Sequence, residues 1–537
     1  YYVLAGSARR IAVVPSRAFH PALRSAWAIG IQLYSLKGGT TKGFGDFAAL
    51  RDFARRAAAS GADAVAISPV HALFWARPDH ISPYAPSTRL FFNPLYAPSV
   101  RAVRSGPERL VNWPVAAREK WQTLLRASDR FANAENTRAF RDFVRRGGKR
   151  LLDHARFEVL DARFRAQGLK DWHEWPWEFR DLASAPARAL NANDPDIAFQ
   201  LFLQWRADQG LASAQQEARR AGMRIGLVID MAVGMDPGGS HAWSAPTEIL
   251  QRLTMGAPPD FFNGKGQNWG LTNLSPLALR RTGFAGFIDT VRCAMRHAGG
   301  IRLDHAMGLE RLWVIPQGAD ARDGVYLRYP RKALMGLLAL ESVRHRTLVV
   351  AEDLGTVPRG FRGRLNRAGI PGMRVLWFER DAKGGFLPPK NWDPPGVALS
   401  TTHDLPTLAG WWSGRDLEWR AIIGWGREQV TRERKVRARE RKAMWQALRE
   451  CGAVKGARPA PSQPGRFIDG AFRALAKATG PLKLLPIEDF IGAREQPNIP
   501  GTIDEHPNWR RRLKDDRALA ASSAKKRAAI LNGRSQP

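Results

Sequence analysis

Cysteine is scarce in this sequence, with Cys293 and Cys451 the two examples among 537 residues. Two cysteines so far apart in the chain cannot build a disulfide framework or a cysteine-based zinc site. Runs of about 18 apolar residues are also missing, which excludes an ordinary transmembrane helix. No signal peptide is visible. These absences predict a protein of the reducing cytoplasm that has no membrane partner.

Acidic residues are too few to balance the basic ones, since 83 Lys and Arg face 50 Asp and Glu and leave a net charge of +33. Such a charge makes nucleic acid a partner to consider. No zinc-finger, RRM or KH signature accompanies it, however, and the densest basic run (432–442) interleaves Glu with Arg, as a solvated helix face does. We therefore interpret the charge as the Arg-rich surface of an enzyme and expect no nucleic-acid partner.

Eight short segments share one format, in which a continuous apolar run is followed by polar or acidic residues. Continuous rather than alternating apolar character is typical of strands buried on both faces of a parallel sheet. The segments are 27–36, 64–69, 224–230, 300–305, 347–353, 373–378, 396–404 and 481–490.

Helical patterns lie between many of these strands, among them 46–62, 201–223 and 284–300, and each runs into glycine. Eight strands alternating with helices predict an α/β fold of the (β/α)8 TIM-barrel type. A doubly wound open sheet is the alternative, but no G-x-G-x-x-G motif follows the first strand.

Two gaps between strands are too long for simple crossovers. We interpret residues 71–223, after strand two, as a large helical insertion, and residues 405–480, after strand seven, as a helical excursion. The expected organisation is then a remnant β module at 1–24, a catalytic barrel at 25–513 and a C-terminal tail at 514–537.

Four carboxylates follow strands three, four, five and seven: Asp230, Asp304, Glu352 and Asp404. Active sites of (β/α)8 barrels lie at the carboxyl ends of the strands. Clustering like charges costs several kcal/mol unless some are protonated or paired, so we expect chemistry that uses them.

Glycoside chemistry is the leading candidate, because a retaining enzyme needs an ionised carboxylate and a protonated carboxyl about 5–5.5 Å apart. Arg302, two residues before Asp304, projects to the same side of its strand and could hold that carboxylate ionised. His305 falls on the opposite face by the same alternation. For the acid we select Glu352, with Asp353 turned the other way.

Eight stretches resemble the 4-α-glucanotransferases of glycoside hydrolase family 77, also called amylomaltases or disproportionating enzymes. They are similar to the long proteobacterial form, from about residue 25 to 513, with its N-terminal modules lacking. The stretches, in the order of the family, are 29–47 (IGIQLYSLKGGTTKGFGDF), 81–96, 225–243, 256–270, 300–309 (GIRLDHAMGL), 349–358, 400–412 and 498–513.

The resemblance implies a retaining 4-α-glucanotransferase that moves α-1,4-glucan segments between maltodextrins through a covalent glucosyl-enzyme. It implies that Asp304 is the nucleophile, Glu352 the general acid/base and Asp404 the transition-state stabiliser. It further implies a flexible loop at 256–268 that covers the site. The substrate-binding residues that we expect are Arg302, His403, Asp230, Tyr84, Trp269, Gln267 and His305.

No cofactor motif and no metal cluster is evident, so the expected partners are maltooligosaccharides and α-1,4-glucans, bound by a monomer or homodimer. Two other functions stay open. One is an α-glucan hydrolase that uses the same carboxylates, and the other is a basic binding protein for nucleic acid or another polyanion.

Overall fold

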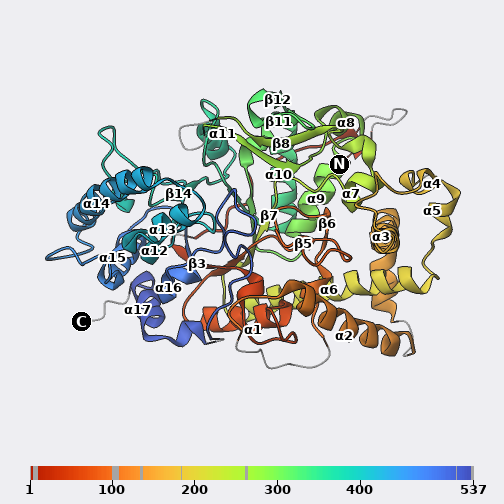
Figure 1. Ribbon diagram of the computed structural model, residues 1–537, viewed down its shortest axis with the longest axis horizontal. Coiled ribbons are helices and arrows are strands. Elements are labelled where there is room, and N and C mark those ends of the chain that lie inside the picture. The colour runs from red at the N-terminus through yellow and green to blue at the C-terminus, as the bar shows by residue number, and fades with distance from the viewer. Residues whose placement is uncertain are drawn as a thin grey trace.

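The computed structural model describes residues 2–3, 10–23, 25–99, 108–133, 137–182, 184–259, 264–515 and 517–533. Its centre is a sheet of eight parallel strands, with helices around it (Figure 1). In chain order the strands are β3 (Ala26–Ile31), β4 (Ala64–Ile67), β7 (Gly226–Met231), β10 (Gly300–Leu303), β13 (Leu348–Ala351), β14 (Met373–Val375), β15 (Val397–Leu399) and β16 (Leu482–Pro486).

The sheet is nearly closed into a ring. Its strand order is β13-β10-β7-β4-β3-β16-β15-β14, and the two end strands meet through a parallel bridge between Ala351 and Gly372. Each of the eight expected strands is present and all neighbouring pairs are parallel. The prediction of a (β/α)8 barrel is therefore confirmed over the doubly wound alternative.

Apolar strands and amphipathic helices explain this closure. Every residue of β7 and β13 is buried, as expected for strands covered on both faces. The first barrel helix begins where the Asp46 carboxylate caps two backbone N–H groups. Helices that pack around the strands include α1 (Phe47–Ala59), α6 (Pro195–Arg220), α9 (Ala285–Met295), α10 (Arg331–His345), α11 (Phe361–Arg367) and α16 (Ile487–Ile491).

The insertion after β4 is helical but does not lie wholly outside the barrel. It starts with the antiparallel strands β5 (His71–Ala72) and β6 (Thr88–Phe92), and its last helix, α6, packs along α1 and β7 as a barrel helix does. The remaining helices are α2 (Trp113–Asn133), α3 (Arg138–Arg165), α4 (Trp177–Arg180) and α5 (Ala185–Ala189).

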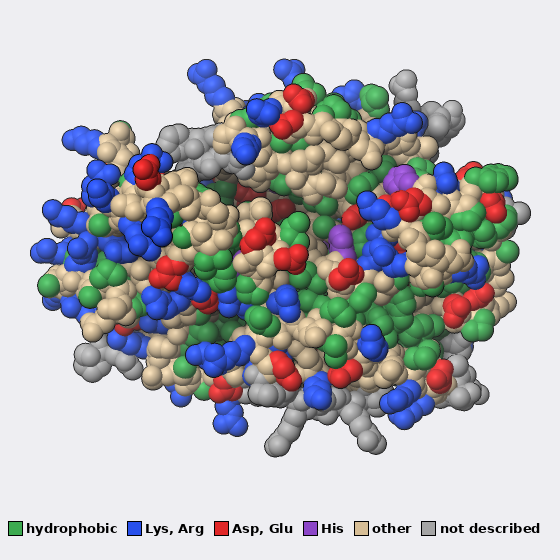
Figure 2. Space-filling model, in the orientation of Figure 1, with side chains coloured by type: hydrophobic (Ala, Val, Ile, Leu, Met, Phe, Trp, Pro, Cys, Tyr) green, Lys and Arg blue, Asp and Glu red, His purple; other side chains and the backbone are tan. Residues whose placement is uncertain are grey.

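The excursion after β15 consists of four helices on the opposite side of the barrel from α3–α5 (Figure 1). A buried ion pair between Arg437 and Asp416, 2.7 Å, joins two of them. Basic side chains gather over this region in the space-filling view (Figure 2). The helices are α12 (Leu408–Ser413), α13 (Arg415–Ile422), α14 (Arg427–Glu450) and α15 (Gly465–Ala476).

A second sheet was not expected from the sequence. It is antiparallel, with strand order β12-β11-β8-β9, and comes from the segments between β7 and β13. Strands β9 and β12 are mostly exposed or half-buried, so they lack the buried apolar signal of the barrel strands. The strands are β8 (Leu253–Ala257), β9 (Gln267–Leu271), β11 (Arg311–Pro316) and β12 (Val325–Arg328).

Both ends of the described chain contact the barrel. β1 (Tyr2–Val3) and β2 (Arg10–Ile11) form a small hairpin, and the Ala18 N–H donates to the Ala368 carbonyl after α11. The C-terminal helix α17 (Ser522–Leu531) packs on α15 and α16. Among the described helices, none combines the length and apolar character needed to cross a membrane. The division of the chain into 1–24, 25–513 and 514–537 stays a prediction.

Candidate active site

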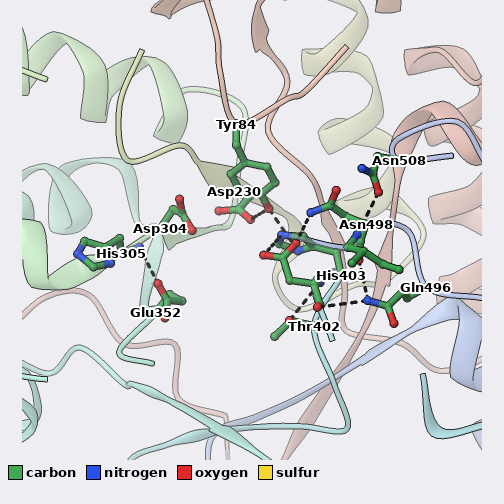
Figure 3. Close-up of polar contacts among 12 residues, drawn as sticks. Tyr84, Asp230, Asp304, His305, Glu352, Thr402, His403, Gln496, Asn498 and Asn508 are labelled. Carbon is green, nitrogen blue, oxygen red and sulfur yellow. Dashed lines mark hydrogen bonds and ion pairs between the residues drawn. The ribbon is translucent and has the colours of Figure 1, made fainter. Parts of the chain in front are cut away.

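Charged residues meet where β7, β10 and β13 end, at the carboxyl end of the barrel (Figure 3). Arg302 in β10 lies directly opposite Asp230 in β7 in the strand register. Leu303 is paired with Ala351, so the residues that follow them, Asp304 and Glu352, also leave neighbouring strands side by side. The register alone therefore brings three of the four expected carboxylates to one edge of the ring.

Arg302 is the cation that holds two of these carboxylates. Its Nη1 lies 2.8 and 2.7 Å from the two oxygens of Asp230 and 2.9 Å from Oδ1 of Asp304. Burial alone would lower the pKa of Arg302, but Asp230 and Asp304 outweigh burial and raise it well above its usual range. Burial raises the pKa of Asp230, and the Arg302 charge opposes that rise.

Glu352 has the environment of a protonated acid. Burial raises its pKa to about 7, while Arg302 acts in the opposite direction. Its Oε2 accepts the His305 N–H at 2.8 Å and its Oε1 accepts the Leu354 N–H at 2.7 Å, so both oxygens are held in place. Asp353 points away as expected, toward β14, where its Oδ1 accepts the Met373 N–H.

Asp404 lies on the loop after β15 and is more exposed than Asp304, with 40% against 17% of the side chain accessible. The Asn498 amide donates to its Oδ1 at 2.7 Å, and His403 Nε2 lies 3.2 Å from its Oδ2. Although burial acts the other way, His403 and Asn498 lower the pKa of Asp404. Burial also opposes the rise in the pKa of His403, which Asp404 causes. The pair is therefore stabilised in its charged form.

Tyr84 connects the carboxylate Asp230, at the end of β7, with His403, on the loop after β15. Its hydroxyl donates to Asp230 Oδ2 at 2.6 Å, and its oxygen lies 3.4 Å from His403 Nδ1. The rings of Tyr84 and His403 stack at 4.8 Å, and Trp509 packs against both at 5.6 and 5.5 Å. Together these rings form an aromatic wall beside the carboxylates.

The remaining predicted residues form a separate group beside Asp304 and Glu352. His305 has a left-handed backbone (φ 45°), so the alternation of β10 ends before it. Its ring meets Trp269 edge to face at 5.1 Å, and burial lowers the pKa of His305 to about 4. The indole of Trp269 donates to Gln267 at 3.0 Å, both residues being in β9. Residues 260–263 of the expected loop at 256–268 lie outside the described residues.

Three residues of the site were missed by sequence reasoning: Asn498, Trp509 and Gln496, whose amide donates to the Asp404 carbonyl at 3.3 Å. All three are uncharged residues in the segment after β16. The pattern of a carboxylate at the end of a strand therefore does not identify them. A usable signal was present for Asn498 and Trp509, because both lie in the stretch 498–513 that carries the family resemblance, whereas Gln496 lies outside it.

The site thus contains the buried carboxyl group of Glu352 and the neighbouring carboxylate of Asp304, which the Arg302 guanidinium holds. A second charged pair, Asp404 and His403, lies across an open recess from them. The face in Figure 2 is hollowed near its centre, and acidic side chains are visible in the hollow. Among the described residues, no group of three or more His, Cys, Asp or Glu side chains is arranged to hold a metal ion. Two carboxyl groups that follow neighbouring strands, one of them with a raised pKa, are the groups that glycosyl transfer with retention requires.

Comparisons with known proteins agree with one another. A family model described as 4-alpha-glucanotransferase matches residues 31–518. The 4-alpha-glucanotransferase of Mycobacterium tuberculosis (strain ATCC 25618 / H37Rv) is 36% identical, over 91% of this chain and 71% of that protein. The 4-alpha-glucanotransferase of Haemophilus influenzae is 32% identical, over 96% and 79%. The crystal structure of amylomaltase from Corynebacterium glutamicum matches with a TM-score of 0.84 and 27% identity, over 96% and 77%.

Proposed function

The chain belongs to the 4-alpha-glucanotransferase family, and from this premise we propose that it is a retaining enzyme that transfers α-1,4-glucan segments between maltodextrins through a covalent glucosyl-enzyme. The observation that carries the proposal is the position of Asp304 and Glu352, each of which directly follows the last paired residue of one of two neighbouring strands. Neighbouring strands lie about 4.8 Å apart. Carboxyl groups leaving them side by side fit the separation of about 5–5.5 Å that retention requires.

In the first step Asp304 is the nucleophile and Glu352 the acid. An Asp304 oxygen attacks the anomeric carbon, the glycosidic C–O bond breaks, and Glu352 gives its proton to the departing 4-oxygen. The pKa of about 7 lets Glu352 carry that proton near neutrality. Arg302 donates a hydrogen bond of 2.9 Å to Asp304 Oδ1 and so holds the nucleophile in place.

In the second step the acceptor replaces the product. Glu352, now ionised, takes the proton from the 4-hydroxyl of an incoming glucan, whose oxygen attacks the anomeric carbon and displaces Asp304. The backbone N–H groups of His305 and Leu354 donate to Glu352 and favour this ionised form. Burial favours the protonated form of Glu352, whereas the two N–H groups favour the ionised form. Because these effects oppose each other, Glu352 can act as the acid in the first step and as the base in the second.

Asp404 stabilises the positive charge of the oxocarbenium-like transition state, and His403 beside it contacts the sugar. Their own pairing and the Asn498 bond keep Asp404 anionic, which suits this role. Tyr84 and Asp230 then bind sugar hydroxyls beside them, and Trp269, Gln267 and His305 line the opposite side. Loop 256–268, by excluding water, would favour a sugar acceptor over hydrolysis.

A product ladder from maltotriose tests the proposal. Transfer gives free glucose together with maltodextrins longer than the substrate, because one maltotriose donates a segment to another. Formation of maltose and glucose without longer chains would instead support the α-glucan hydrolase that uses the same carboxylates. The Asp304→Asn variant is the control, since it keeps the size of the side chain but cannot form the covalent intermediate.

A further inference from the structure

A cavity lies inside the barrel and is continuous with the proposed glucosyl site. Its walls include Tyr84, Asp230, Arg302 and His403, and below them apolar side chains that the barrel strands turn inward, such as Val228, Val350, Leu399 and Leu484. The same cavity is lined by Gln32 and Glu488, which have no role in the proposed mechanism.

Gln32 and Glu488 come just after two paired strands, β3 and β16, whose parallel register ends with Pro486 opposite Gly30. Gln32 directly follows β3 and Glu488 lies in the first turn of α16, and both line the cavity. Neither residue follows the pattern of an apolar strand interior. Instead they extend the polar rim of the barrel beyond the four carboxylates already described.

The two side chains present oxygen atoms to the cavity, and among the described residues the Gln32 amide oxygen lacks a donor. Gln32 Oε1 is buried and has no hydrogen-bond partner. The hydrogen bond that supports the Glu488 carboxylate comes from its own backbone N–H. Its neighbour Asp489, by contrast, is fully used, because its oxygens accept from the Ser400 hydroxyl and the Leu408 N–H. Buried oxygens without donors are costly, and a ligand rich in hydroxyl donors removes that cost.

We propose that Gln32 and Glu488 form a hydroxyl-binding floor, at which they accept hydrogen bonds from the glucosyl unit held beside His403 and Tyr84. The inference rests on the proposed function, because it takes the ligand to be a glucan. Sugar hydroxyls fit these two acceptors, and the apolar side chains that line the same cavity fit the C–H faces of a pyranose. The two residues are thus binding residues for the donor rather than participants in proton transfer.

The charge of Glu488 makes the floor sensitive to pH. Burial raises the pKa of Glu488 to about 7, and the ionisable groups that face it are Asp489 in its own helix, His403 after β15 and Tyr34 after β3. Hydrogen bonds from sugar hydroxyls are stronger to the ionised carboxylate. Bound sugar therefore favours the ionised form, and KM for maltotriose falls as pH rises through about 7.

Steady-state kinetics with maltotriose between pH 6 and 8 test the floor. We expect Glu488→Leu and Gln32→Leu each to raise KM about tenfold, the effect of one hydrogen bond, while kcat changes less than threefold. Glu488→Gln keeps an acceptor and is expected to raise KM less, but without the change of KM near pH 7. The double variant should raise KM less than the product of the single effects, since both residues hold the same sugar.

Glu379→Gln is the matched control. Burial also raises the pKa of Glu379, but this residue does not line the cavity, so KM and its pH dependence should stay unchanged. Three results would overturn the proposal: KM within twofold of the unmodified enzyme in both Leu variants, fully multiplicative effects in the double variant, or a KM step near pH 7 that survives in Glu488→Gln. Failure of the proposed function is distinguishable, because the unmodified enzyme would then give no longer maltodextrins.

Discussion

Replacing Arg302 by Leu tests the electrostatic design of the site most directly. The substitution removes the cation that lies within 2.9 Å of both Asp230 and Asp304. Leucine puts an apolar side chain in its place in the strand. Only 15% of the Arg302 side chain is accessible, so solvent replaces little of the lost charge. The variant therefore contains two carboxylates that share a buried edge of the barrel without a counter-ion.

The expected loss of stability is about 3–5 kcal/mol at neutral pH, the range for breaking a buried ion pair by removing one partner. It should grow with pH. Without Arg302 the pKa of Asp230, which burial already raises, rises further in the folded state, while the unfolded state keeps its ordinary pKa. A group with a raised folded pKa loses stability as pH rises from the unfolded value through the folded one. The variant is thus less impaired at pH 5 than at pH 8.

Chemical denaturation at pH 5 and pH 8, with maltotriose kinetics alongside, measures both effects. Because Arg302 also opposes the rise in the pKa of Glu352, residual kcat in the variant should persist to higher pH than in the unmodified enzyme. Arg362→Leu is the matched control: it pairs with the strand-end carboxylate Asp353, but 47% of its side chain is accessible, so its loss should cost far less. A loss below 1 kcal/mol for Arg302→Leu, equal at both pH values, would refute the reasoning.

Three further outcomes follow from the same geometry. Asp304→Asn should reduce both transfer and glucose release to below a few per cent, and retention of more activity in the product ladder would contradict its role as nucleophile. In the unmodified enzyme kcat should fall as pH rises through about 7, because Glu352 must be protonated, and Glu352→Gln should abolish that limb of the profile. Tyr84→Phe removes the hydrogen bond of 2.6 Å to Asp230 and should lower kcat/KM about tenfold, whereas an unchanged value would show that the Tyr84 ring alone matters.

The barrel could be predicted because its strands are locally distinctive. Segments such as 348–351 are apolar on both faces, and their format repeats eight times along the chain. The second sheet could not be predicted in this way, since strands such as β12 are exposed or half-buried and carry no continuous apolar run. Likewise α6 looked like part of an insertion, and only its packing along α1 identifies it as a barrel helix.

Some residues of the candidate site could likewise be predicted from the sequence, whereas others could not. Charges at strand ends led to Asp230, Asp304, Glu352 and Asp404, and a period of two placed Arg302 beside Asp304. The same period failed one residue later, because His305 adopts a left-handed backbone. Residues that reach the site from a distant segment of the chain carried no such signal. Asn498 is an example, because it donates a hydrogen bond to Asp404, which lies 94 positions away in the sequence.

Local periodicity is written in the chain itself, which is why the fold class and the strand-end residues can be recognised without coordinates. Proximity through space is not, because it depends on the strand order around the ring and on the register between neighbours. That order brings Arg302 between Asp230 and Asp304 and directs Glu488 and Gln32 to the same cavity. The pKa of Glu352 is likewise a property of the closed barrel, since burial and the nearby guanidinium exist only once the ring has formed.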